Sequence, residues 1–267
     1  MSDVLTVVTL LVALAAAGAA LLTLREVRRL RGTISDRSQE AVALVDGITG
    51  ALRRTVRREH RHTRAVVDGL FSLSGLSADG ATMPTTQGWA ASPMVLRQLA
   101  EQVSQHRPDL VVELGGGGSS VLLGRLLTMQ GHGRVVSIDH DPAYAELTRE
   151  HLRRHGVADV VEVRVAPLVP VEVGGDTFNW YDPAVFADLA EIDLLFVDGP
   201  PGKSGPLARF PAVPVLADRC SPGALVLLDD GGRAPERRMA DRWIAENSAT
   251  EVVSDDIGTG WIQLRLP

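Results

Sequence analysis

Residues 109–120 read Asp-Leu-Val-Val-Glu-Leu-Gly-Gly-Gly-Gly-Ser-Ser, and the apolar run Val121-Leu122-Leu123 follows them. An apolar segment that closes on an acidic residue and then on consecutive glycines is typical of a buried parallel strand that enters a tight turn. Glycine lets the backbone approach a ligand where a Cβ would collide, and the next helix begins with unpaired N–H groups. The stretch therefore predicts a loop that binds a nucleotide cofactor. A glycine-rich turn without a ligand is the alternative.

The spacing of the glycines tests which nucleotide the loop could hold. A dinucleotide-binding fingerprint has glycine at its first, third and sixth positions. Counted from Gly115, the third position is Gly117, but the sixth is Ser120. A phosphate-binding loop ends in Gly-Lys-Ser/Thr, whereas Gly118 is followed by Ser119. Neither motif fits, which disfavours an NAD-dependent oxidoreductase but leaves it open as an alternative.

Further apolar segments indicate strands separated by helical patterns; they cover residues 134–139, 160–165, 192–197 and 225–228. Two more strand-like segments, 251–257 and 261–266, close the chain around a turn that contains glycines. Strands that alternate with helices predict an α/β fold with a mostly parallel sheet, here ending in an antiparallel hairpin.

Asp139 ends the second of these strands, 24 residues after Gly115. An acidic side chain at this position can accept hydrogen bonds from both ribose hydroxyls of an adenosine cofactor. An acid at this position indicates that the cofactor contains adenosine but does not indicate which reaction is catalysed, because NAD-dependent enzymes also carry such an acid.

The pattern Glu113-x-Gly115-x-Gly117 resembles motif I of the class I S-adenosylmethionine-dependent methyltransferases, with Ser119 where that family often has a third glycine. The resemblance covers about residues 89–267 and implies a Rossmann-like sheet of seven strands, mostly parallel, with a terminal antiparallel hairpin. It implies S-adenosyl-L-methionine as the cofactor. The cofactor-binding residues that it implies are Glu113, Gly115, Gly117, Ser119, Asp139, His140, Ala166, Pro167 and Asp198.

Asp198 follows the fourth strand, and Asp229-Asp230 follow the fifth. Ligands of an open α/β sheet bind beyond the carboxyl ends of its strands, so these acids should meet Glu113 and Asp139 at one edge. Carboxylates that crowd together repel one another unless a cation lies among them. The sulfonium of the cofactor is one such cation, and a divalent metal is another.

These three acids resemble, position by position, the metal-binding Asp and Asp-Asn of the catechol O-methyltransferase type, with Asp230 where asparagine is usual. The chain also resembles the branch grouped as methyltransferase family 24, through Asp198-Gly-Pro-Pro-Gly202, residues 208–212 and Asp229-Asp230. We predict Asp198, Asp229 and Asp230 as catalytic residues that either hold Mg²⁺ or include a direct general base. The alternative is that Asp229 and Asp230 only cap a helix expected over residues 235–246.

Trp180 and Tyr181 follow a glycine-bearing loop that begins at Gly174. Aromatic side chains on a loop beside a parallel sheet can accept a flat substrate, or they can simply pack the loop onto the domain. We assign both residues, together with Arg209, to the acceptor substrate.

Residues 4–24 contain no charged side chain, and a helix of that length spans roughly 30 Å, the thickness of a bilayer core. Arg25, Arg28, Arg29 and Arg31 follow. Residues 1–31 are therefore predicted to be a transmembrane anchor with a basic flank, which leaves the rest of the chain in the cytoplasm. A cleaved signal peptide is the alternative, favoured by the small residues 15–20 but not by the single charge, Asp3, before the apolar run.

Residues 32–71 keep a helical but broken heptad pattern, which predicts either a coiled coil that forms a homodimer or a helix against the next domain. Their arginine run over 53–64 could bind anionic lipid or be a solvated face. Residues 72–92 are rich in Ser, Gly, Thr and Pro and predict a flexible linker or lid, so the methyltransferase domain should cover 93–267.

The 267 residues carry a net charge of −6, so we expect no nucleic-acid partner. Cys220 is the only cysteine, which excludes an internal disulfide and a cysteine zinc site. The predicted function is O-methylation of a small-molecule or lipid-linked envelope precursor at the cytoplasmic face of the membrane. The alternatives are an NAD-dependent oxidoreductase and a membrane scaffold that keeps the fold without turnover.

Overall fold

The computed structural model describes residues 21–31, 44–52, 55, 91–255 and 260–267. The chain divides into two compact units, Met1–Arg57 and Arg58–Pro267. In the first, residues 21–31 and 44–52 are helical, and their leucines, Leu21, Leu22 and Leu52 among them, are exposed.

The predicted membrane anchor falls mostly outside the described residues, since residues 1–20 are not among them. In the part of the chain that the structure describes, no helix is both long enough and apolar enough to cross a membrane. Most of the predicted coiled coil and nearly all of the predicted linker over 72–92 also lie outside the described residues.

The second unit is built on a seven-stranded sheet in the order β3-β2-β1-β6-β7-β9-β8. Its strands are β1 (Leu110–Leu114), β2 (Arg134–Asp139), β3 (Val161–Val165), β6 (Ile192–Val197), β7 (Cys220–Asp229), β8 (Thr250–Asp255) and β9 (Trp261–Arg265). The first five pair in parallel, and β9 pairs antiparallel with both β7 and β8. The predicted α/β sheet with its terminal antiparallel hairpin is therefore confirmed. The strand order reverses direction beside β1, which places a ligand crevice beyond the carboxyl ends of β1 and β6.

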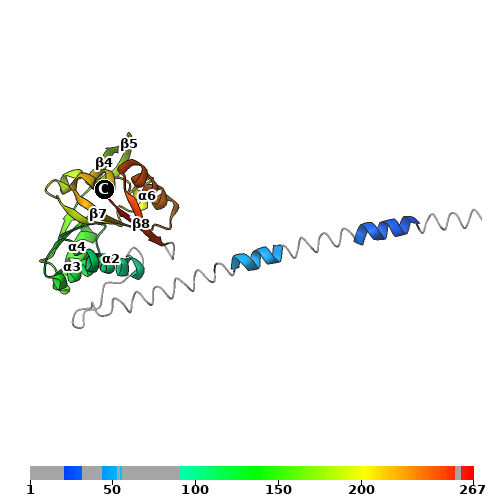
Figure 1. The fold of residues 1–267 in the computed structure, drawn as a ribbon, viewed down its shortest axis with the longest axis horizontal. Helices are drawn as coiled ribbons and strands as arrows, with labels where there is room; N and C mark the ends of the chain where they lie inside the picture. The colour runs from blue at the N-terminus through cyan, green and yellow to red at the C-terminus, as the bar shows by residue number, and fades with distance from the viewer. Residues whose placement is uncertain (1–20, 32–43, 53–54, 56–90, 256–259) are drawn as a thin grey trace, which may run out of the picture. The chain divides into compact units, whose positions relative to one another are not determined.

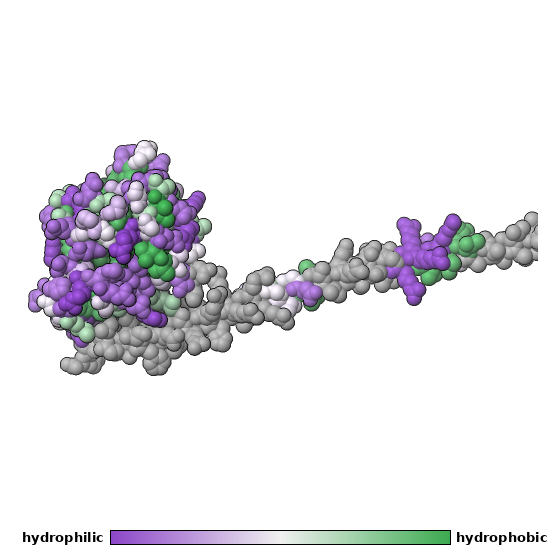
Figure 2. Space-filling view, viewed as in Figure 1, coloured by the Kyte–Doolittle hydropathy of each residue, from purple (hydrophilic) through white to green (hydrophobic). Residues whose placement is uncertain are grey.

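Helices cover both faces of this sheet (Figure 1). One face carries α2 (Pro93–His106), α3 (Gly118–Gln130) and α4 (Pro142–Arg154). The other carries α5 (Ala212–Leu216), α6 (Ala234–Asn247) and a separate two-stranded sheet of β4 (Leu168–Val173) and β5 (Asp176–Tyr181). Short 3₁₀ turns η1 (Pro183–Phe186), η2 (Gly202–Ser204) and η3 (Ala217–Arg219) complete this side. The face of the molecule drawn in Figure 2 is mostly hydrophilic, with small apolar patches.

Alternation along the strands divides the interior into two cores. In β1, Val111 points into the core under α2 and α3, while Val112 points into the core under the hairpin and α6. The first core is mainly aliphatic, although Phe196 and Trp261 belong to it. The second holds most of the buried aromatic rings: Phe178, Trp180, Tyr181, Phe186, Phe210 and Trp243.

The hairpin β4–β5 was not predicted, and the expectation that Trp180 and Tyr181 lie on a loop is wrong, because both belong to β5. Val173 pairs with Asp176 across a two-residue turn of Gly174 and Gly175, whose φ angles are 60° and 87°. Two consecutive residues with positive φ form the turn type that matches the twist of a hairpin, and glycine adopts it without steric cost. Trp180 and Tyr181 therefore lie on a strand and face inward.

Candidate functional site

Acidic side chains predicted for the site lie at the tips of four neighbouring strands. Glu113 belongs to β1, Asp139 ends β2, Asp198 follows β6, and Asp229 ends β7. The N–H of Asp198 donates to the carbonyl of Leu114 over 2.9 Å, which keeps the tips of β1 and β6 in register. The structure thus brings the predicted acids to one edge of the sheet.

Glu113 is completely buried, and one of its two oxygens is satisfied. Oε2 accepts hydrogen bonds from the hydroxyls of Ser120 and Ser137, the latter at 2.7 Å, and Ser120 Oγ accepts from the N–H of Gly117 at 3.0 Å. Oε1 is buried with no hydrogen-bond partner among the described residues. Burial raises the pKa of Glu113, although the hydroxyls of Ser119, Ser120 and Ser137 lower it, and the charge on Asp139 raises it further. A buried acceptor without a donor is costly, so this oxygen is suited to a cationic donor from a ligand.

The glycine loop brings two backbones together and leaves space in front of it. Gly115 has φ 95°, and a Cβ added there would lie 3.1 Å from the backbone nitrogen of Gly199 after β6. Gly117 has φ 148°, and a Cβ added there would meet nothing within 4 Å. Gly115 is therefore required by packing, whereas Gly117 borders open space at the start of α3, where Ser119 is buried.

Asp139 is held at the tip of β2. Its Oδ1 accepts from the N–H of Asp141 at 2.9 Å and lies 3.3 Å from Nδ1 of His140. Burial raises the pKa of Asp139, while the hydrogen bond from Asp141 and the neighbouring His140 lower it. The N–H of Ala166 donates to the carbonyl of Asp139 over 2.8 Å. The side chain of Ala166 is buried, and Pro167 is exposed at the rim.

Arg209 occupies the space between the acids of β6 and β7. Its Nη2 lies 3.2 Å from Oδ1 of Asp198 and 3.1 Å from Oδ2 of Asp230, and its Nη1 donates to the carbonyl of Asp229 at 3.1 Å. Arg233 adds a second ion pair to Oδ2 of Asp230 at 2.8 Å. Arg209 is 5% exposed, and its assignment to the acceptor substrate stays a prediction. It ties together the tips of two strands.

Burial also raises the pKa values of two acids beside Arg209, Asp198 and Asp229. The pKa of Asp198 lies well above its ordinary value because the carboxyl is buried and faces Asp229, although Arg209 opposes the shift. Burial and the charge on Asp230 raise the pKa of Asp229 to about 6, while the N–H of Asp230 donates to its Oδ1 at 2.6 Å. A carboxyl with such a pKa is suited to accept a proton near neutral pH.

The predicted Mg²⁺ site at Asp198, Asp229 and Asp230 does not fit this geometry. Mg²⁺ requires several oxygen ligands directed at one point, whereas two of these carboxylates are directed at a guanidinium. Within the described ranges, no group of three or more His, Cys, Asp or Glu side chains is arranged to hold a metal ion.

Trp180 and Tyr181 are both fully buried, which fits the alternative that they pack this segment onto the domain. Trp180 stacks on Phe186 at 5.4 Å between ring centroids, so it packs the core. The hydroxyl of Tyr181 lies against Gly199, where an added Cβ would overlap it. Burial raises the pKa of Tyr181 well above its ordinary value, and the charge on Asp139 adds to the shift. Tyr181 therefore reaches the acidic rim from inside the protein.

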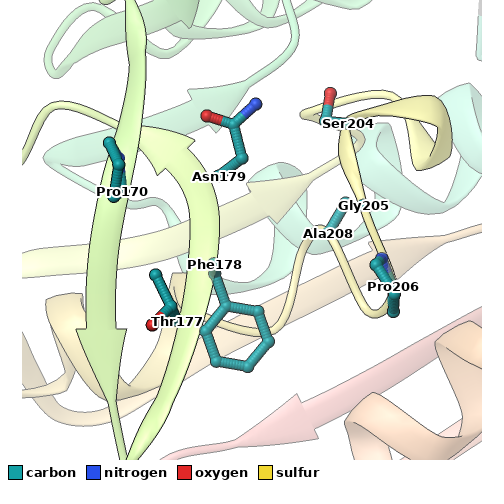
Figure 3. A pocket seen from close by; sticks show the side chains of 8 residues that line it. All are labelled: Pro170, Thr177, Phe178, Asn179, Ser204, Gly205, Pro206 and Ala208. Atoms are coloured by element: carbon teal, nitrogen blue, oxygen red, sulfur yellow. The ribbon is translucent and has the colours of Figure 1, made fainter.

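Two cavities are lined in part by the segment that follows η2. The first, of about 380 Å³, lies between the hairpin and this segment; Figure 3 shows Asn179 and Ser204 on its opposite sides. The second, of about 490 Å³, is lined by Arg209 and by residues of α6 that include Glu236 and Arg238. Because Arg209 lines the second cavity, this cavity adjoins the acids of β6 and β7.

The comparisons with known proteins agree with this geometry. A family model described as a methyltransferase domain matches residues 112–231. The catechol O-methyltransferase of Mycobacterium tuberculosis is 32% identical over 183 residues, which cover 65% of this chain and 72% of that protein. The chain belongs to the class I S-adenosylmethionine-dependent methyltransferases.

The fold of this methyltransferase is shared by a solved structure with little sequence likeness. The methyltransferase PaMTH1 of Podospora anserina, solved with S-adenosylhomocysteine bound, aligns with a TM-score of 0.54 at 14% identity, covering 76% of this chain and 88% of that one. At this identity the match shows the common fold alone.

Sequence reasoning missed three polar residues of the methyltransferase site. Ser120 and Ser137 hold Glu113, although Ser120 was considered only as a missing glycine. Glu236 is buried near Arg209, and its Oε2 has no hydrogen-bond partner within the described part of the chain. Ser137, which lies between the apolar residues Val136 and Ile138 of β2, is a signal that could have been used, because a buried hydroxyl needs a hydrogen-bond partner.

Proposed function

We propose that this methyltransferase transfers the methyl group of S-adenosylmethionine to a hydroxyl oxygen of a small-molecule acceptor. The unpaired, buried Oε1 of Glu113 is the observation that carries the cofactor part of the proposal. The relative from Mycobacterium tuberculosis, which is named for catechol O-methylation, supports a hydroxyl acceptor.

Each part of the cofactor has a matching group at the rim. Glu113 would accept hydrogen bonds from the α-ammonium group, and the N–H groups around Gly117 and Ser119 would receive the carboxylate at the start of α3. Asp139, supported by His140, would hold the ribose hydroxyls, and the turn of Ala166 and Pro167 would border the adenine. When bound, S-adenosylmethionine supplies an electrophilic methyl group on a positively charged sulfur.

The acids beyond β6 and β7 belong to the acceptor side in this proposal. A hydroxyl must lose its proton as it attacks, so a carboxylate at the rim is required as the general base. Asp229 is the better candidate because its carboxylate is not paired with Arg209, whereas that of Asp198 is. The cavity of about 490 Å³ beside Arg209 is large enough to hold a small-molecule acceptor.

Calorimetry on the full-length protein tests the cofactor assignment. We expect S-adenosylhomocysteine to bind and NAD not to bind; binding of NAD alone would refute the proposal. Formation of S-adenosylhomocysteine in the presence of a catechol or of a lipid extract would then distinguish turnover from a scaffold that only binds the cofactor.

Membrane attachment is a second part of the proposal, and it rests on the sequence. The uncharged residues 4–24 and the arginines after them support a single-pass anchor with the catalytic unit in the cytoplasm, and residues 34–71 would support a dimer. An anchored enzyme would meet lipid-linked envelope precursors, which makes them a candidate acceptor class. Reporters that are active only inside or only outside the cell, fused after Pro267, test the orientation; an external signal would overturn it.

A further inference from the structure

The acids that resemble metal ligands already share a cation that belongs to the chain. The guanidinium of Arg209 contacts the Asp198 carboxylate and the Asp230 carboxylate at 3.2 and 3.1 Å. It also binds the main-chain carbonyl of Asp229 at 3.1 Å. One side chain thus bridges the tips of β6 and β7.

This cation is permanent. The Arg209 side chain is 6% exposed, and the acids around it raise its pKa above an already high value. Arginine does not lose its proton under physiological conditions, and it cannot dissociate as a bound ion can. A divalent metal placed among the same carboxylates would meet a fixed positive charge and would have to displace two ion pairs.

The position of Arg209 is fixed by the packing of the backbone on both sides of it. The preceding residue, Ala208, and the next one, Phe210, are both buried, and the carbonyl of Phe210 accepts a hydrogen bond from the indole of Trp243 at 2.8 Å. The backbone on both sides of Arg209 is therefore fixed against the core. A side chain anchored in this way has little freedom to swing out and admit an ion.

We propose that Arg209 replaces the divalent metal at this rim, so that the enzyme positions its acceptor without Mg²⁺. The inference rests on the proposed transfer to a hydroxyl. Arg209 acts as a positioning residue in it, because its guanidinium holds the Asp198 and Asp230 carboxylates in place.

Binding of Mn²⁺, followed by electron paramagnetic resonance of the full-length protein, tests the proposal without an acceptor substrate. We expect the wild-type protein to bind no stoichiometric Mn²⁺ at millimolar metal. We expect Arg209→Ala, which frees the carboxylates, to gain a site for one Mn²⁺. Arg164→Ala is the matched control, because Arg164 also bridges two acids, Glu162 and Asp188, but at an exposed edge of the sheet; it should gain no such site.

Stoichiometric Mn²⁺ binding to the wild-type protein would overturn the proposal. The proposal would also be overturned if a metal chelator slowed the formation of S-adenosylhomocysteine by about tenfold or more and added Mg²⁺ restored it. If Arg209→Ala does not fold, Arg209→Lys keeps a cation and should stay free of Mn²⁺, and the wild-type titration still decides. Failure of the protein to bind S-adenosylhomocysteine would refute the proposed function instead, and calorimetry measures that separately.

Discussion

Replacing Glu113 by glutamine removes one charge from the interior and keeps the shape of the side chain. In the present geometry, the glutamine carbonyl can still accept from Ser120 and Ser137, while its amide nitrogen takes the place of Oε1. The cofactor ammonium would then face a donor instead of an anionic acceptor. A hydrogen bond to a charged group contributes about 1.5–3 kcal/mol, so affinity for S-adenosylhomocysteine should fall roughly 10- to 100-fold.

The same substitution should stabilise the protein when no ligand is bound. Burial raises the folded-state pKa of Glu113, so its ionisation costs stability as the pH rises from 4.5 through that raised value. Glu113→Gln removes this cost, and its free energy of unfolding should exceed that of the wild type at neutral pH.

Calorimetry with S-adenosylhomocysteine and urea unfolding without ligand measure the two effects. Glu162→Gln, on the exposed edge strand β3, is the control and should leave the affinity within about twofold. An unchanged affinity in Glu113→Gln would refute the assignment of Oε1 to the ammonium. A lower affinity together with a large loss of stability would mean that Glu113 supports the loop rather than the cofactor.

Three further predictions concern packing and titration. Gly199→Ala overlaps the hydroxyl of Tyr181, so urea unfolding should show a loss of about 1–3 kcal/mol that Tyr181→Phe reduces; equal losses in both backgrounds would refute the contact. Burial raises the pKa of the Cys220 thiol to about 12, so thiol reagents at pH 8 should label the native protein far more slowly than the unfolded one, and equal rates would contradict this. The Arg164 guanidinium lowers the pKa of Asp188 from 3.8 to about 2. The ion pair therefore stabilises the protein above pH 3.8, and this stabilisation is lost as the pH falls from 3.8 to about 2. The acid unfolding of Asp188→Asn should lack this pH dependence.

The central strands of the sheet, such as β1 and β6, could be predicted because they are strongly apolar and end in recognisable ways. The strand expected over 134–139 has those bounds in the structure, since Gly133 precedes it and Asp139 closes it. The acids at the strand tips were also predictable, because parallel strands bring their carboxyl ends to one edge.

The hairpin β4–β5 was not predictable by the same means. Its burial pattern is irregular, and its residues pack on other elements instead of belonging to the main sheet. The pairing of Arg209 was also hidden, because its carboxylate partners lie 11 and 21 residues away along the chain, at the ends of separate strands. Whether an arginine or a metal fills a cluster of acids depends on such tertiary distances, and spacing in the sequence does not contain them.

Trp180 and Trp243 are completely buried in the core beneath the hairpin and α6, whereas Trp261 lies in the opposite core. The remaining tryptophan, Trp89, falls outside the described residues. Among the described tryptophans, two therefore report by their fluorescence on one face of the sheet and one on the other. Far-ultraviolet circular dichroism is weighted instead toward the face with α2, α3 and α4, which holds the larger share of helix. If one face loosens before the other, the two spectroscopic signals will change at different denaturant concentrations.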